Sequence, residues 1–342
     1  MDLPTTGPLL RPSLLAAGWT DDELRRLRRN GDLTAITGGA YVHTTDPRLH
    51  RGEARHALLV AATVPRVAPD SVISHVSAAV QHGLPVWNVS LDRVHTTRPR
   101  RSGGLRTGRL HVHTAPLNAP DVTDVTDVGG VTVTSVARTL LDVARTVGFE
   151  QAVVLTDAAL HRHLCTRDDL AAGLERMARW RGTPAARRVV GFADPRAESP
   201  GESRSRVAVA RLGLPAPVLQ WEVRRDGVLL GRADFGWPEF GKVGEFDGLT
   251  KYGRLLRPGE IPADVVFAEK IREDAIRAED LGVTRWIWPE IDDFTRVARR
   301  LALRGTSAVW TAPPSGRPCC PDDACVIYRS GRTGARHGGW PA

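Results

Sequence analysis

The chain has 342 residues, of which 42% are hydrophobic and 25% charged, and it carries a net charge of +8. This length predicts more than one core, and the composition excludes a chain that is disordered throughout. The excess of positive charge favours a polyanionic partner, nucleic acid before an anionic membrane. A GC-rich genome, which enriches arginine in every protein, is the alternative explanation for the many arginines.

Targeting signals are absent from the sequence as it stands. The first ten residues lack a basic region followed by an apolar core, and no apolar run has the length of a membrane span. Three of the four cysteines, Cys319, Cys320 and Cys325, lie in a polar tail without zinc-finger spacing. We therefore expect a cytoplasmic protein that does not bind a membrane.

Residues 1–65 are predicted to form a small winged helix-turn-helix domain. A short helix is expected over 12–17, and Thr20 begins a capping box with Glu23 at the start of a helix over 21–30. Gly31 ends that helix. Two β-prone runs then flank Gly38-Gly39, as in a hairpin wing, and a further helix is expected over 48–63.

The predicted helix over 21–30 has one apolar and one basic face. Leu24 and Leu27 are placed inward, and the arginines occupy the exposed side. Such a face can contact phosphates and guanine edges in the major groove of double-stranded DNA. A plain solvated basic face is the alternative. The DNA-binding residues predicted here are Arg25, Arg26, Arg28 and Arg29.

Residues 66–195 are predicted to form a mixed α/β middle domain. Residues 72–81 suit a strand or the start of a helix, and 93–97, 110–114 and 131–134 suit strands. Ser135 is expected to cap an apolar helix, and further helices continue to about 188. The basic loop 98–106 can add phosphate contacts or be ordinary surface.

Several histidines of the middle region invite a metal-binding interpretation. His111 and His113 fall on one strand face, and the others have no aspartate or cysteine partner at ligand spacing. Core or surface roles are therefore favoured over a metal site. The histidines considered are His75, His82, His111, His113, His161 and His163.

Residues 196–310 are predicted to form an α/β/α domain, followed by a disordered tail over 311–342. A helix starts around Ser199 to Glu202 and stops at Gly213. Strands are expected over 218–223, 229–237, 242–247 and 283–288, with Asp226-Gly227 as a hairpin turn. A helix is expected over 263–278, and a last one from Pro289 to about 305.

The acids of this third region suggest a metal site. Glu245 and Asp247 share one strand face, and antiparallel pairing of 229–237 with 242–247 would bring Asp234 beside Glu245. Clustered carboxylates repel one another unless a cation joins them. Mg²⁺ prefers oxygen ligands and keeps waters, one of which can attack a phosphate. We predict that Asp234 and Glu245 bind Mg²⁺ (or Mn²⁺) for phosphodiester hydrolysis.

Two further residues are candidates for this chemistry. Glu202 could hold a water or a second metal ion, and Lys251 could stabilise charge on the phosphorane. Each has an alternative role: Glu202 as the capping partner of Ser199, and Lys251 as a surface lysine. Asp234 could equally be a solvated acid at a strand end.

These residues, in this order, resemble the PD-(D/E)xK restriction-endonuclease-like superfamily, and within it domains similar to very-short-patch repair endonucleases. The resemblance covers about 196–300 and rests on the helix Glu202, on Asp234-Phe-x-Trp-Pro, on Glu245-Phe-Asp-Gly and on Arg285-Trp-x-Trp. It implies that Asp234 and Glu245 bind metal, that Glu202 assists, and that Arg272 and Arg277 face DNA or brace the core. The usual catalytic lysine slot holds Asp247, so Lys251 substitutes, a second acid serves the metal, or activity is reduced.

Residues 8–190 resemble AbiE-type (AbiEi-like) antitoxins and transcriptional regulators. The matching segments are Leu15 to Val42, Ile73 to Val80, Gly83-Leu-Pro and Val133 to Asp142. The resemblance implies promoter binding by a winged helix, and a middle region that supports autoregulation or neutralises a cognate toxin protein. Such regulators often dimerise, so a homodimer is one expectation.

Two functions follow for an α+β multidomain protein of this kind. The first is a DNA-binding protein whose nuclease-like domain cuts DNA with Mg²⁺. The second is a non-enzymatic antitoxin or transcriptional repressor with a degenerate nuclease fold, which Asp247 in the lysine slot favours. A structural DNA-bridging protein would leave the acids unexplained.

Overall fold

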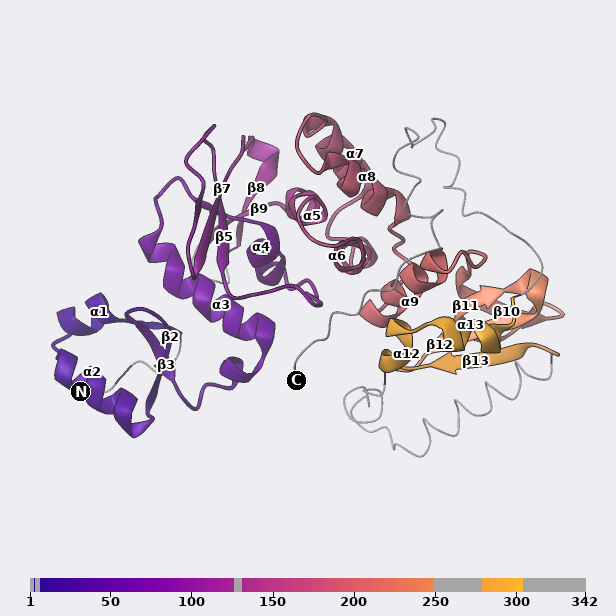
Figure 1. The fold of residues 1–342 in the computed structure, drawn as a ribbon, viewed down its shortest axis with the longest axis horizontal. Coiled ribbons are helices and arrows are strands. Elements are labelled where there is room, and N and C mark those ends of the chain that lie inside the picture. Colours follow the sequence, from indigo (N-terminus) through magenta and orange to yellow (C-terminus); the bar gives the residue numbers. More distant parts are fainter. Residues whose placement is uncertain (1–2, 4–6, 126–130, 249–278, 304–342) are drawn as a thin grey trace, which may run out of the picture. The chain divides into compact units, whose positions relative to one another are not determined.

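The structure is a computed structural model that describes residues 3, 7–125, 131–248 and 279–303 (Figure 1). It is a mixed α+β protein with several sheets. The chain divides into two compact units, residues 1–204 and 205–342. The described helices include none that is long and apolar enough to span a bilayer.

The first unit begins with a three-stranded antiparallel sheet and two helices. The sheet order is β1-β3-β2, and the predicted capping box of Thr20 and Glu23 is present, with Gly31 in the left-handed region at φ 84°. Leu24 packs with residues of the sheet in a small core, as predicted. The elements are β1 (Leu9–Leu10), α1 (Arg11–Ala16), α2 (Asp21–Asn30), β2 (Leu33–Thr37) and β3 (Ala40–His43).

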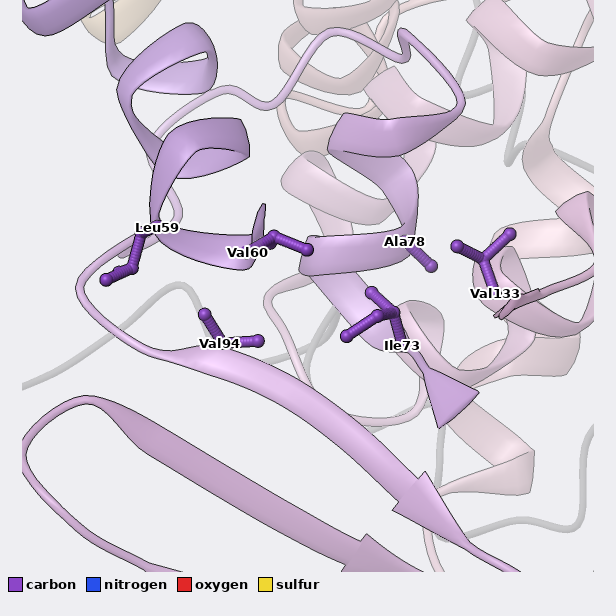
Figure 2. Close-up of a cluster of buried hydrophobic side chains, with 6 residues drawn as sticks. All are labelled: Leu59, Val60, Ile73, Ala78, Val94 and Val133. Atoms are coloured by element: carbon purple, nitrogen blue, oxygen red, sulfur yellow. The ribbon is translucent and has the colours of Figure 1, made fainter. Parts of the chain in front are cut away.

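Helix α3 (Gly52–Thr63) joins this sheet to the next part of the unit. Leu58 and Ala62 pack against residues of the first sheet, whereas Leu59 and Val60 belong to the next core (Figure 2). The predicted helix over 48–63 is interrupted, because a separate 3₁₀ turn at Pro47–His50 precedes α3.

A six-stranded mixed sheet forms the middle of the first unit, in the order β6-β7-β5-β4-β9-β8. Ile73, Val94 and Val133, from three of its strands, bury their side chains with Ala78 of α4 (Figure 2). The elements are β4 (Val72–Ile73), α4 (His75–Gln81), β5 (Val94–Arg98), β6 (Leu105–Arg106), β7 (Leu110–Thr114), β8 (Val122–Val125) and β9 (Val131–Thr134).

Helices follow this sheet, as predicted. Ser135 occupies the N-cap position of α5, but its side chain accepts no capping hydrogen bond, which corrects the predicted role. Instead, the Thr139 hydroxyl donates to the Thr134 carbonyl at 3.1 Å. The helices are α5 (Val136–Ala144), α6 (Phe149–His161), α7 (Arg167–Arg176), α8 (Thr183–Phe192) and α9 (Pro200–Arg211), and α9 continues across the division between the units.

The second unit contains a four-stranded sheet in the order β10-β11-β12-β13. The first three strands form an antiparallel meander, and β13 lies parallel to β12. Trp286 of β13 is buried and donates from its indole nitrogen to the Ser205 hydroxyl at 2.7 Å. The elements are β10 (Val218–Arg225), β11 (Val228–Trp237), β12 (Lys242–Phe246), β13 (Gly282–Trp286), α12 (Trp288–Asp292) and α13 (Thr295–Leu301).

The predicted hairpin turn between β10 and β11 is present, with Asp226 and Gly227 both at positive φ, 49° and 82°. The last strand ends two residues before the predicted position, because Trp288-Pro289 opens a helix in which the Glu290 carboxylate accepts from the Ile287 backbone at 3.2 Å. The predicted helix over 263–278 lies outside the described residues.

Candidate functional site

Asp234 and Glu245 lie on neighbouring antiparallel strands, each one residue beyond the paired residues Phe235 and Gly244. Phe235 pairs with Gly244, and continuing this antiparallel register by one residue sets Asp234 opposite Glu245. Opposed residues of this kind have Cβ atoms about 5 Å apart on one face of the sheet. One carboxylate oxygen of Asp234 accepts from the Phe246 backbone N–H at 2.8 Å. Asp234 is half-buried and Glu245 is buried.

A cation already lies beside the buried acid. The parallel register of β12 and β13 pairs Glu245 with Arg285, and the Arg285 Nη2 atom lies 2.8 Å from Glu245 Oε2. No site role for Arg285 was predicted from the sequence. Only the pairing of β13 with β12, across a segment outside the described residues, brings it to this position. The Glu245 carboxylate is therefore paired with the guanidinium group of Arg285.

The other predicted residues of the acidic site have different outcomes. Asp247 directly follows β12, is half-buried, and donates its backbone N–H to the Trp286 carbonyl at 2.8 Å. This bond continues the pairing with β13 by one residue, and the shared face of Asp247 and Glu245 stays a prediction. Three predicted residues, Lys251, Arg272 and Arg277, lie outside the described residues.

Glu202 makes the capping contacts that were weighed as its alternative role. Its carboxylate accepts from the Ser199 hydroxyl at 2.7 Å and from the Glu198 backbone N–H at 3.0 Å, and its own N–H donates to the Ser199 hydroxyl at 3.2 Å. Glu202 belongs to the first compact unit, whereas Asp234 and Glu245 belong to the second. Its part in metal chemistry remains a prediction.

The four arginines of α2 are exposed, as predicted, while Leu24 of the same helix is buried. Arg25, Arg28 and Arg29 line a shallow hollow with Leu33 and Ala35 of β2. Such a row of guanidinium groups beside a concave surface is suited to phosphate oxygens.

The hairpin beside α2 is held at its turn by one side chain. The guanidinium of Arg66 donates to the carbonyls of both Gly38 and Gly39, the latter at 2.8 Å. Gly39 lies at φ 67°, a conformation that glycine adopts without strain. A second hollow runs along this hairpin and includes Arg28, Tyr41 and Arg109 in its lining. The turn therefore projects as a braced loop next to the basic helix.

The predicted basic loop over 98–106 is partly engaged with an acid. Arg98 and Arg100 both bind the carboxylate of Asp70, at 2.8 and 3.0 Å. The hydrogen bond from Arg98 is the largest cause that lowers the pKa of Asp70. These two arginines therefore stabilise the loop, and phosphate contacts from it would fall to the remaining basic residues.

The structure also gathers histidines that the sequence analysis set aside. His75, His111 and His113 lie together, and His95, which was not considered, joins them. Burial lowers the pKa of His95 to about 4 and lowers the pKa of His75 and His113 strongly. The signal for His95 was its alternation within β5, but the parallel partner strand could not be identified from the sequence.

The comparisons with known proteins give few functional clues. No family model matches the chain. An uncharacterized protein of Mycobacterium tuberculosis, present in two strains, is 34% identical over 178 residues, which cover 52% of this chain and 61% of the relative. The chain thus spans about three fifths of the length of the curated relatives it matches. A crystal structure of a Mycobacterium tuberculosis protein aligns with a TM-score of 0.36 and 16% identity, over 58% of this chain and 75% of that one.

Proposed function

We propose that the chain is a DNA-binding protein that hydrolyses phosphodiester bonds with a divalent metal ion. The observation that supports cleavage most is the position of Asp234 opposite Glu245, with Asp247 one residue beyond the strand end. Two opposed carboxylates on a buried sheet face are costly to keep charged unless cations lie beside them. Such a pair is the usual protein contribution to a metal-assisted nuclease site.

The donor set fits Mg²⁺ or Mn²⁺, because it consists of carboxylate oxygens. Asp234 and Glu245 would hold the ion, and Asp247 would add negative charge in the position where related nucleases carry lysine. When bound, the ion supplies an activated water and offsets charge on the phosphate. Arg285, whose Nη2 atom lies 2.8 Å from Glu245 Oε2, would orient that carboxylate.

The DNA-binding part of the proposal rests on α2 and the neighbouring hairpin. The order β1, α1, α2, β2, β3 is that of a helix-turn-helix followed by a wing, and the exposed arginines lie on the second helix. We infer that α2 enters the major groove and that the hairpin turn braced by Arg66 contacts the backbone. Double-stranded DNA is therefore the expected ligand.

Cleavage of supercoiled and linear DNA with Mg²⁺ or Mn²⁺ tests the proposal. The variant Asp234→Asn with Glu245→Gln removes both negative charges while keeping the side-chain shapes. We expect it to lose cleavage by at least a hundredfold while DNA binding stays unchanged. Glu239→Gln is the matched control, because Glu239 is an exposed acid between β11 and β12. If cleavage persists in the double variant, the acids are not the catalytic site.

A second candidate function is a non-enzymatic AbiE-type repressor or antitoxin. The ion pair between Arg285 and Glu245 favours it, because a carboxylate already neutralised by arginine binds a metal ion less readily. Under this alternative the wild-type protein binds DNA and cuts none with either metal. Co-purification of a cognate toxin encoded by a neighbouring gene would then identify the partner.

A further inference from the structure

Strands β5 and β7 lie side by side in the six-stranded sheet (Figure 1). Four histidine rings of the first unit contact one another at these two strands. The parallel register pairs His95 with His111 and Thr97 with His113, so His95, His111 and His113 project from the same face. His75, the first residue of α4, stacks on His113 with ring centroids 3.7 Å apart. Three elements distant in sequence thus contribute imidazoles to one place.

The nitrogens of three of these rings are close enough to share an ion. One ligand nitrogen each from His75, His95 and His113 lie within 4.8 Å of one another. The Nδ1 atom of His95 is 3.0 Å from the Nε2 atom of His113. A tetrahedral ion with Zn–N bonds of about 2.0–2.1 Å needs ligand nitrogens roughly 3.3 Å apart. Binding therefore requires the stacked rings of His75 and His113, now 14° from parallel, to turn towards the ion and the more distant nitrogens to approach one another.

The ring of His75 is oriented by its neighbours. Its Nδ1 atom lies 3.0 Å from the Ser74 hydroxyl, which also accepts a hydrogen bond from the Thr97 hydroxyl at 2.8 Å. Nε2 of His75 is therefore the nitrogen left for a metal ion. His75 also adopts a left-handed φ of 53°, which costs energy in a residue other than glycine. Outer hydrogen bonds of this kind orient the histidines of metal sites.

Four arginines place positive charge near the proposed ligands. Arg138 and Arg145 contribute to lowering the pKa of His75, and Arg93 and Arg106 contribute to lowering that of His95. Arg138 and Arg145 both bind the buried carboxylate of Asp142, at 2.8 and 2.9 Å. Their positive charge is thereby offset locally. His111 lies beside His113, with ring centroids 3.9 Å apart, but outside the group of three that converges.

We propose that His75, His95 and His113 bind a transition-metal dication of the Zn²⁺ class. Three neutral imidazole ligands suit Zn²⁺, Co²⁺ or Ni²⁺ and not Mg²⁺, which prefers oxygen. Three protein ligands leave a fourth tetrahedral position to a water molecule or an exogenous ligand. This site differs in ligand chemistry from the carboxylates Asp234 and Glu245 and does not depend on the proposed nuclease activity.

The test uses the untagged full-length chain after dialysis against a chelator. Titration with Co²⁺, followed by visible absorption, should give one tetrahedral site per chain from which Zn²⁺ displaces Co²⁺. Zn²⁺ affinity, measured by calorimetry, should fall at least tenfold in His95→Ala and in His113→Ala. It should stay unchanged in His111→Ala and in the control His50→Ala, because His50 is exposed and lies outside the cluster.

Several outcomes would overturn the site. One is Zn²⁺ affinity that is unchanged in both ligand variants, and another is an equal loss in His111→Ala. A thiolate-to-cobalt charge-transfer band in the near ultraviolet would place the ion on cysteines instead. If a ligand variant fails to fold by circular dichroism, the wild-type chain decides the question. Zn²⁺ should protect His75, His95 and His113 from diethyl pyrocarbonate, as mapped by mass spectrometry, and modification that Zn²⁺ leaves unchanged would rule the site out.

Discussion

Arg138 is a charged residue buried together with the acid that it binds. Its Nε atom lies 2.8 Å from a carboxylate oxygen of Asp142, and both side chains are 1% exposed. Among the described residues its Nη2 atom has no hydrogen-bond partner, and the guanidinium lies 4.9 Å from the ring centroid of Trp180. Burial raises the pKa of Asp142, while the charge of Arg138 acts in the opposite direction. The charge of Arg138 therefore offsets part of the cost of burying the Asp142 carboxylate.

Removal of Arg138 alone should be costly. We expect Arg138→Met to lower the free energy of unfolding by about 3–5 kcal/mol, because Asp142 is then buried without its main partner. Adding Asp142→Leu should recover part of this loss, since it removes the carboxylate that has lost its main partner. The buried Asp121, which also lies 3.4 Å from Arg138, keeps its contact with Arg176. Urea denaturation of the two single variants and the double variant measures this coupling. Additive losses would show that the pair does not interact.

His56 is a buried imidazole held in its neutral form. Its Nδ1 atom is 2.7 Å from the Leu91 carbonyl, and its Nε2 atom is 2.8 Å from the Ser77 hydroxyl, which also accepts from the His95 backbone N–H. The contact with a carbonyl makes Nδ1 the protonated nitrogen, so Nε2 accepts from Ser77. Burial is the main cause that lowers the pKa of His56.

Acid should destabilise the fold through this residue. A histidine pKa that is lower in the folded than in the unfolded chain contributes stability above about pH 6.5, and this contribution is lost as the pH falls towards the folded pKa. In that range one histidine changes the free energy of unfolding by up to about 1.4 kcal/mol per pH unit. We expect His56→Gln to show a shallower decrease between pH 7 and 5 in urea denaturation. His50→Gln should follow the wild-type curve, and equal slopes in all three proteins would contradict the assignment.

At the scale of elements, the sequence predicted a helix cap and a turn correctly, but it did not show which distant strands lie side by side. The capping box of α2 and the Asp226-Gly227 hairpin turn were predictable, because both are determined by residues within a few positions. The opposition of Asp234 and Glu245 followed from one short antiparallel connection. Arg285 could not be placed, since alternation within β13 does not reveal which strand lies beside it. His95 was missed for the same reason.

The start of α2 should matter for stability as well as position. The Thr20 hydroxyl accepts from the Glu23 backbone N–H, and the Glu23 carboxylate accepts in return from the Thr20 N–H at 2.8 Å. Thr20→Ala should lower the free energy of unfolding by about 1 kcal/mol. Thr45→Ala, at an exposed position outside any helix, is the control and should change it little. Thermal or urea unfolding measures both, and equal effects would argue against the cap.

Close packing between strand and aromatic ring supports the acidic site. A Cβ atom on Gly244, next to Glu245, would lie 2.6 Å from the Trp286 ring and 3.0 Å from that of Trp237. Gly244→Ala should therefore destabilise the second unit by about 1–3 kcal/mol. Gly191→Ala, in α8 with nothing within 4 Å of the added atom, should be neutral or stabilising. Chemical denaturation followed by tryptophan fluorescence compares the two, and a stable Gly244→Ala protein would show that the rings move aside.

For the whole molecule, the net charge of +8 and the clustering of arginines on α2 predict two different modes of DNA binding. General attraction to a polyanion would depend on the number of charges and little on their position. A defined DNA surface would depend on where the charges lie. Two exposed arginine pairs of equal charge allow the two cases to be compared. One pair is Arg26 and Arg29 of α2, and the other is Arg187 and Arg188 of α8.

The salt dependence of the proposed DNA binding distinguishes these two cases. Replacing Arg26 and Arg29 with glutamine should reduce the slope of log affinity against log salt by up to about 0.9 per lost phosphate contact. The Arg187→Gln, Arg188→Gln pair should leave the slope close to that of the wild type. Fluorescence anisotropy with two unrelated duplexes over a range of salt concentrations measures it. Equal reductions in both double variants would favour non-specific attraction.

Helix α3 contributes to two hydrophobic cores, which limits where the chain can be divided. Leu58 and Ala62 serve one hydrophobic core while Leu59 and Val60 serve another, so each turn of the helix is shared by two sheets. Cutting the chain after residue 65 would leave Leu59 and Val60 without the sheet that covers them. The fragment 1–65 would then expose apolar side chains of α3 and tend to aggregate. Transferring this fragment to another protein would therefore require the six-stranded sheet as well.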